Sequence, residues 1–192
     1  MLIMCMIMML TTTAMTIKNY SLLLLGFFFL ITSCQESETE FKTVAYQDSF
    51  TIDIPIYMVE MDLENPEASI QFGNDLESHY MVVIRESHEK LAGFGIEMDI
   101  QAYADLMINY AEISIGSAKV EKMTKGIETI NDMESIGYEI EGLDNVGCPI
   151  YYQIMYLRSE RALYSVTTWC DGSRKESCAP VMTEMLRSIK EN

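Results

Sequence analysis

Two cysteines near the carboxyl end of the chain have a spacing that allows a disulfide bond. Cys170 and Cys178 are separated by the polar stretch DGSRKES, whose glycine helps it to fold back on itself. Exported proteins reach an oxidising compartment, where cysteines pair. We therefore predict a bridge between Cys170 and Cys178, with two free thiols, or pairing of one of them with Cys148, as the alternatives. Cys148 itself is expected to be a small buried residue at the start of a strand.

Aromatic side chains are concentrated in two later segments, IYYQIMYL at 150–157 and ALYSVTTW at 162–169. Tyr151 and Tyr152 are adjacent, so in a strand they point to opposite faces of a sheet. With Trp169 they are candidates to line a groove for a peptide, a glycan or a lipid, because aromatic rings offer contact area together with a polar group. In the alternative, helices cover both faces and these residues belong to the core.

Residues suited to catalysis or metal binding are scarce. The only histidines are His79 and His88, which we interpret as surface residues. Glu86 and His88 could share one face of a strand, but no third ligand stands at metal-binding spacing. Phosphate-loop, nucleophile-elbow and zinc-protease motifs do not occur. We therefore expect no metal, no cofactor and no enzymatic activity. The 29 acidic residues leave one alternative open, an unrecognised carboxylate pair that hydrolyses polymers of the cell envelope.

The first 33 residues have the layout of a signal peptide. Lys18 precedes the apolar run LLLLGFFFLI at 22–31. That run spans about 15 Å as a helix, half of a bilayer core, and small polar residues follow it. These features predict a secretory signal over residues 1–33. Residues 1–14 add a second apolar run before the positive charge, so we expect the true start at Met15, with an extended leader as the alternative.

The end of this segment, Ile31-Thr32-Ser33-Cys34, resembles the lipobox of bacterial lipoproteins. The resemblance implies cleavage before Cys34 and attachment of lipid, palmitate included, to its sulfur and its new amino group. More than one acyl chain gives stable membrane anchoring. A plain signal peptide with an incidental cysteine, or an uncleaved anchor, is the alternative.

Acidic residues follow Cys34 in the stretch QESETE. They predict a solvated tether over residues 34–45. An acid-rich stretch after a lipidated cysteine is similar to the surface-export signal of Bacteroidetes lipoproteins. The protein is thus expected to be lipid-anchored at the outer membrane. It faces the outside if the stretch is such a signal, and the periplasm if it is only a linker.

The remaining residues, 46–192, have the composition of one folded domain. The whole chain has a net charge of −16, although its first 33 residues contain no acid. So acidic a domain disfavours nucleic-acid binding, which needs a basic face. Alternating and continuous apolar runs predict about seven strands, and helical spacing predicts two main helices, one capped by Asp99 and one with Pro180 in its first turn. Because no strand–helix–strand alternation occurs, we expect an α+β sandwich with a mostly antiparallel sheet.

This order of elements resembles the PsbP-like family. The resemblance rests on SFTIDIP at 49–55, the helix over 100–111, the aromatic hairpin and the final helix ending in RSIK. It implies a binding or assembly factor without known chemistry. The segment ASIQFGNDLESHYMVVI is also similar to uncharacterised Bacteroidetes lipoproteins. We therefore expect a lipid-anchored, non-catalytic protein whose partner is an unknown envelope protein or ligand.

Overall fold

The computed structural model describes residues 39–192, which form one compact unit. The predicted signal peptide, the lipidated Cys34 and the acidic stretch after it lie outside the described residues. Among the residues that are described, no helix has the length and apolar character needed to cross a membrane.

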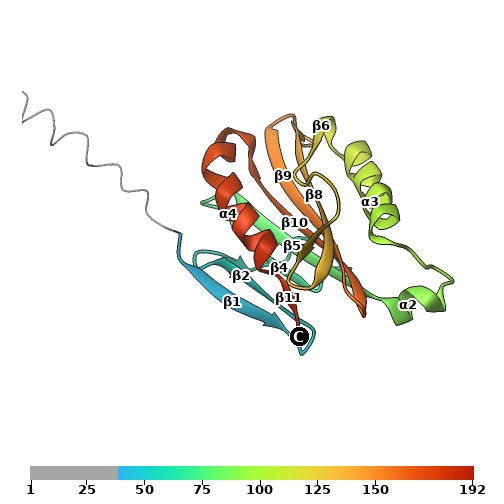
Figure 1. Ribbon diagram of the computed structural model, residues 1–192. Helices are drawn as coiled ribbons and strands as arrows, with labels where there is room; N and C mark the ends of the chain where they lie inside the picture. Colours follow the sequence, from blue (N-terminus) through green and yellow to red (C-terminus); the bar gives the residue numbers. More distant parts are fainter. Residues whose placement is uncertain (1–38) are drawn as a thin grey trace, which may run out of the picture. The chain divides into compact units, whose positions relative to one another are not determined.

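An eight-stranded antiparallel sheet forms the centre of the domain (Figure 1). The strands follow one another in the order β3-β4-β5-β10-β9-β8-β6, and β7 also pairs with β8. Their bounds are β3 (Val59–Glu60), β4 (Ile70–Asn74), β5 (His79–Ser87), β6 (Gly116–Lys122), β7 (Glu128–Ile130), β8 (Met133–Leu143), β9 (Pro149–Arg158) and β10 (Ala162–Asp171). The long strands β8, β9 and β10 are neighbours because each is joined to the next by a short turn.

A second, three-stranded sheet combines the two ends of the domain. Its order is β1 (Phe41–Tyr46), β2 (Phe50–Pro55) and β11 (Lys190–Glu191). The predicted alternation in β2 is present, because Phe50, Ile52 and Ile54 are all at most 1% exposed. These side chains enter the core between this small sheet and the large one.

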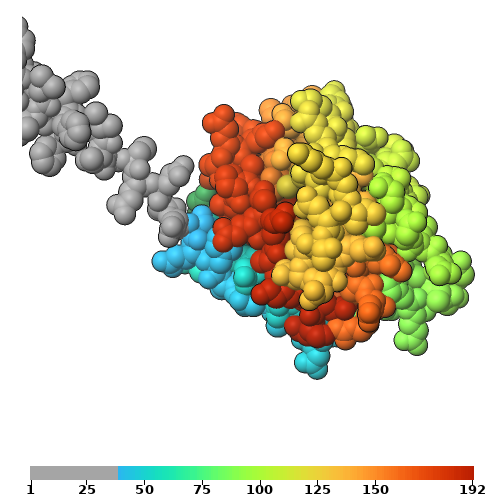
Figure 2. All heavy atoms as spheres, in the orientation of Figure 1, coloured from blue at the N-terminus to red at the C-terminus, as the bar shows by residue number. Residues whose placement is uncertain are grey.

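The two main helices pack on opposite faces of the large sheet. α4 (Lys175–Ser188), preceded by the single turn η1 (Gly172–Arg174), packs against β2, β9 and β10. α3 (Ile100–Ser114) packs against β6, β8 and β9, and the carboxylate of Asp99 accepts a hydrogen bond from its backbone at Ala102 over 2.7 Å. Alternate residues of β9 show the division, since Met155 lies in the core on the α4 side and Ile154 in the core on the α3 side. Figure 2 shows the α4 face, where the helix lies between the first strands and the segment around β7.

The predicted fold class, α+β with a mostly antiparallel sheet, is confirmed. The boundaries differ in three places. β1 begins at Phe41, inside the predicted tether, so the folded domain starts before residue 46. This strand lies at the edge of its sheet with no residue fully buried, and its sequence therefore lacks strict alternation. The short helix α2 (His88–Gly93) and the two-residue strands β3 and β11 have too few residues for a periodic pattern. Finally, α4 begins before its expected start, with Pro180 inside the helix.

Candidate functional site

Cys170 and Cys178 lie together under the first turns of α4. Both are buried, in a small cluster with Tyr151 and Met182. Within the described residues both are free thiols, and they contact one another by a side-chain hydrogen bond. That contact, with some help from the guanidinium of Arg174, lowers the pKa of Cys178, while the same contact and burial raise the pKa of Cys170. The chain thus brings the two sulfur atoms together, and the bond between them stays a prediction.

Cys148 is placed differently from its expected position in the core. It stands directly before β9, as predicted, but its side chain is exposed. The reason is local, because the backbone N–H of Cys148 donates to the carboxylate of Asp144 over 2.8 Å and so completes the turn between β8 and β9. A turn residue in this position faces solvent.

Tyr151 cannot line an open groove, which corrects its place in the predicted aromatic site. It is 0% exposed and lies on the α4 face of the sheet, where the side chain of Gln153 donates to its hydroxyl over 2.9 Å. The ammonium group of Lys175 lies 4.8 Å from the centre of its ring. Tyr151 is therefore a core residue with a satisfied hydroxyl.

Tyr152 and Trp169 instead belong to a row of partly exposed rings on the other face. Trp169 of β10 pairs with Tyr152 of β9 on one side and with Tyr80 of β5 on the other. The ring centres of Trp169 and Tyr80 are 5.5 Å apart and nearly parallel, and those of Trp169 and Tyr152 are 5.9 Å apart. We call Tyr80, Trp169 and Tyr152 the aromatic row.

The aromatic row lies beside α3 rather than under it. α3 packs on β6, β8 and β9, so it stops short of β10 and β5, which carry Trp169 and Tyr80. This half of the face keeps partly exposed side chains, with Thr167 and Ile84 following the row along their strands. Tyr80 was not among the predicted site residues, although its position directly before the MVVI run of β5 would have placed it on a central strand.

His79 is buried, which corrects its interpretation as a surface residue. It is 1% exposed because it alternates with Met81 and Val83 on the α4 face of β5. Both ring nitrogens are occupied, Nδ1 by the hydroxyl of Tyr57 at 2.9 Å and Nε2 by the hydroxyl of Thr168 at 3.1 Å. Such a ring has no nitrogen left for a metal ion.

His88 and Glu86 do not share a strand face either. β5 ends at Ser87, and His88 begins α2, where its Nε2 donates to the carbonyl oxygen of Ser159 over 3.0 Å. Glu86 accepts a hydrogen bond from Tyr103 of α3 over 3.4 Å. Within residues 39–192, no three side chains of His, Cys, Asp or Glu are grouped as metal ligands would be.

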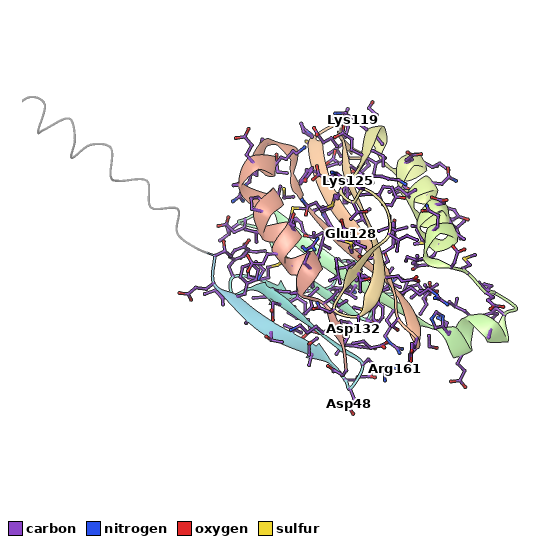
Figure 3. All side chains as sticks on the ribbon, viewed as in Figure 1. Asp48, Lys119, Lys125, Glu128, Asp132 and Arg161 are labelled. Atoms are coloured by element: carbon purple, nitrogen blue, oxygen red, sulfur yellow. The ribbon has the colours of Figure 1, made fainter. Side chains whose placement is uncertain are left out.

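A polar cavity of about 360 Å³ lies near the carboxyl end of the chain, lined by Asn131, Asp132, Met133, Ser159, Glu160, Arg161, Glu191 and Asn192. Figure 3 labels Asp132 and Arg161 at this end of the molecule. The carboxylate of Glu191 is fully engaged, since it accepts from Ser159 at 2.8 Å, Tyr164 at 2.7 Å and Arg161 at 3.1 Å. Burial acts to raise the pKa of Glu191, but these bonds prevail and lower it.

Comparison with solved structures defines the class of fold. The cyanobacterial PsbP (CyanoP) from Synechocystis sp. PCC 6803 is similar with a TM-score of 0.52 and 13% identity, over 84% of this chain and 99% of that chain. LpqN, described as involved in cell envelope biogenesis of Mycobacterium tuberculosis, is similar with a TM-score of 0.53 and 8% identity, over 82% of this chain and 94% of that chain. A protein from Bacteroides thetaiotaomicron VPI-5482 reaches a TM-score of 0.46, which is too low to carry an argument.

The domain therefore has a PsbP-like α+β fold. No family model matches the chain, and no curated protein is similar to it in sequence. The likeness thus rests on the arrangement of elements, and function has to be argued from the side chains on this fold.

Proposed function

We propose that the protein is a lipid-anchored component of the bacterial cell envelope that acts as a non-catalytic binding or assembly factor. The observation that carries the binding role is the aromatic row. Soluble domains cover most of their large aromatic side chains, and a set of adjacent rings left partly exposed is typical of a contact surface. The occupant is an envelope protein or an envelope ligand, and nucleic acid is disfavoured by the net charge of −16.

The two similar folds support the envelope setting. LpqN is described as involved in cell envelope biogenesis, and CyanoP is a PsbP protein. We extend that setting to this chain because its first 34 residues carry a signal-like segment that ends in ITSC. On this proposal the acyl groups on Cys34 hold the domain at the outer membrane, facing the periplasm or the cell exterior.

The alternative function, hydrolysis of envelope polymers by a carboxylate pair, gains no support from the acidic groups. A general acid of this kind needs a raised pKa. Three carboxyl groups among the described residues have a resolved pKa shift, and in Glu141, Asp171 and Glu191 the shift is downward. Glu191, which lines a cavity, is held ionised by its three hydrogen bonds. A non-catalytic role is therefore the proposal.

Lipidation is tested by replacing the acceptor. Cells producing the protein or its Cys34→Ala variant are fed a labelled fatty acid, and the protein is then isolated. We expect label in the wild type and none in the variant. Cys148→Ala is the matched control, because that exposed cysteine lies in the folded domain and should leave labelling unchanged. Label that persists in Cys34→Ala would show that the anchor is elsewhere.

The binding role is tested by crosslinking in living cells. The full chain is compared with Trp169→Ala, which opens the centre of the aromatic row, and with Ile127→Ala, which removes a 53% exposed apolar side chain of the β6–β7 connection. Loss of a crosslinked partner in Trp169→Ala alone supports the proposed surface. Equal recovery of every partner from all three proteins removes the aromatic row as the contact.

A further inference from the structure

A second concave site lies on the opposite side of α3's amino-terminal end, between α2, the segment that joins α2 to α3, and the end of β9. It is a cavity of about 450 Å³, lined by His88, Leu91, Ala92, Gly95, Ile96, Glu97, Met98 and Arg158. This volume is in the range of sites that hold small molecules. In Figure 1 the site is found near the label α2.

The cavity contains a hydrogen-bond donor that the protein leaves unused. Nε of Arg158 is buried and has no hydrogen-bond partner within residues 39–192. The guanidinium is otherwise held loosely, by a 3.4 Å contact between its Nη1 and the carboxylate of Glu134. Buried polar groups almost always have a partner, and a buried donor of a charged group without one is costly. An occupant that supplies an oxygen atom to Nε would remove that cost.

The rest of the lining limits what such an occupant can be. Leu91, Ile96 and Met98, with Ala92 and Gly95, provide an apolar wall that favours a hydrocarbon body. His88 is fixed by its bond to the carbonyl oxygen of Ser159, so it does not compete for Arg158. Glu97 is exposed and also lines the cavity, which disfavours an occupant with more than one negative charge.

The segment between α2 and α3 adds an apolar rim. Phe94 is 74% exposed and Ile96 is 38% exposed, an unusual degree of exposure for two large apolar side chains so close in sequence. Gly95 stands between them with a φ of +71°, a left-handed conformation that glycine adopts without strain. This turn presents both neighbouring side chains at the same side of the domain as the cavity.

We propose that this cavity binds a small monocarboxylate with an apolar body, of the class of short-chain fatty acids, with the carboxylate on Arg158 and the chain against Leu91, Ile96 and Met98. Guanidinium groups match the geometry of carboxylates and bind them through two parallel N–H groups. The proposal deepens the non-catalytic binding role, on which it rests, by giving a ligand class. It does not depend on the lipid anchor or on the aromatic row.

The probe is hexanoate, and the full chain is held in lipid nanodiscs. Binding is measured by equilibrium dialysis of labelled hexanoate against nanodiscs carrying the wild type or Arg158→Gln. Partition of hexanoate into lipid is the same in both samples, so the difference reports the protein site. We expect saturable binding in the wild type and at least a tenfold weaker affinity in Arg158→Gln. Arg187→Gln, which changes an arginine on the outside of α4, should bind as the wild type does.

A second readout separates loss of the site from loss of the fold. In protein labelled with ¹³C at its methionine methyl groups, hexanoate should shift the signal of Met98, assigned by Met98→Leu, and leave the signals of the core residues Met182 and Met185 in place. Hexanol at the same concentration should give a much smaller shift, because it lacks the carboxylate. Absence of saturable hexanoate binding to the wild type, or equal affinity in Arg158→Gln, overturns the assignment. Either result leaves the crosslinking and lipidation experiments unaffected, so failure here is distinct from failure of the proposed function.

Discussion

Tyr57 donates its phenolic hydrogen to Nδ1 of His79 over 2.9 Å, inside the core beneath α4. The direction of this bond follows from the other side of the ring. Thr168 uses its own hydrogen on the carbonyl oxygen of Tyr80 at 2.9 Å, so it accepts from Nε2–H of His79. The imidazole is therefore neutral, with its hydrogen on Nε2, and both nitrogens are satisfied only in that state.

Acid should destabilise the domain through this histidine. Burial, assisted by the guanidinium of Arg174 and opposed by Glu77, lowers the pKa of His79 to about 4. In the unfolded chain the pKa is the ordinary 6.5, so between pH 6.5 and pH 4 the unfolded state binds the extra proton. We expect full stability from this group above pH 6.5 and a loss of about 3 kcal/mol as the pH falls to 4.

The measurement is urea unfolding at a series of pH values in the wild type and in His79→Gln. Carboxyl groups contribute equally to both proteins, so subtraction isolates the histidine. The free energy of unfolding of the variant should be lower at pH 7 and fall less steeply below pH 6.5. Parallel pH profiles in the two proteins would contradict a buried neutral His79.

Oxidation should stabilise the domain through Cys170 and Cys178. A bridge across the short segment between them removes conformational freedom from the unfolded chain and contributes about 2.5 kcal/mol on the chain-entropy model. Thiol titration of denatured protein recovered from the envelope should detect neither cysteine, while Cys148 remains reactive. In Cys178→Ser the thiol of Cys170 should reappear. Detection of both thiols in the wild-type protein would show that the contact stays unbonded.

Replacement of Trp169 by leucine should lower the free energy of unfolding by about 1–3 kcal/mol. The substitution removes two ring contacts, to Tyr80 and to Tyr152, and each such pair contributes about 0.5–1.5 kcal/mol beyond the area it buries. Circular dichroism during urea unfolding measures the change, since the variant has no tryptophan to report it. Tyr110→Leu, at a 61% exposed ring on α3, is the control and should change stability by less than about 0.5 kcal/mol. Equal effects of the two substitutions would mean that the row makes no special contribution.

Gly142 of β8 should not tolerate a side chain. A Cβ atom there would collide with the side chain of Ile115 and lie 2.9 Å from the carbonyl oxygen of Gly116, which belongs to the neighbouring strand. Gly142→Ala should therefore destabilise the domain by about 1–3 kcal/mol in thermal or urea unfolding. Gly126→Ala is the matched control, because a Cβ atom there meets open space. A stable Gly142→Ala protein would show that β6 can move away from β8 at little cost.

Local patterns were sufficient for the elements with a clear buried face. Phe50, Ile52 and Ile54 alternate because β2 has one face in the core, and Asp99 begins α3 because its carboxylate caps the first turn. The edge strand β1 could not be predicted in the same way, since both of its faces keep contact with solvent. For such a strand, pairing with β2 supplies the stability that its own side chains do not.

The site residues depended on contacts that no local pattern contains. The sequence places Tyr151 and Tyr152 on opposite faces of β9, but which face α4 covers is decided by packing between distant segments. The same is true of His79, whose position is polar in type and buried in fact. The cavity at Arg158 was not predicted at all, because it forms only where α2 and its following loop meet the end of β9.

The pairing of β11 with β2 has a consequence for how the chain reaches its folded state. Glu191 aligns with Phe50, and the backbone N–H of Asn192 donates to the carbonyl oxygen of Ser49 over 3.1 Å. The strand that opens the core thus obtains one of its two neighbours from the last residues to be synthesised. A chain that emerges amino-terminus first, from a ribosome or across a membrane, carries β2 with an open edge until its final residues are free. Completion of the domain is therefore a late event, and even a short trim at the carboxyl end would leave that edge without its neighbour.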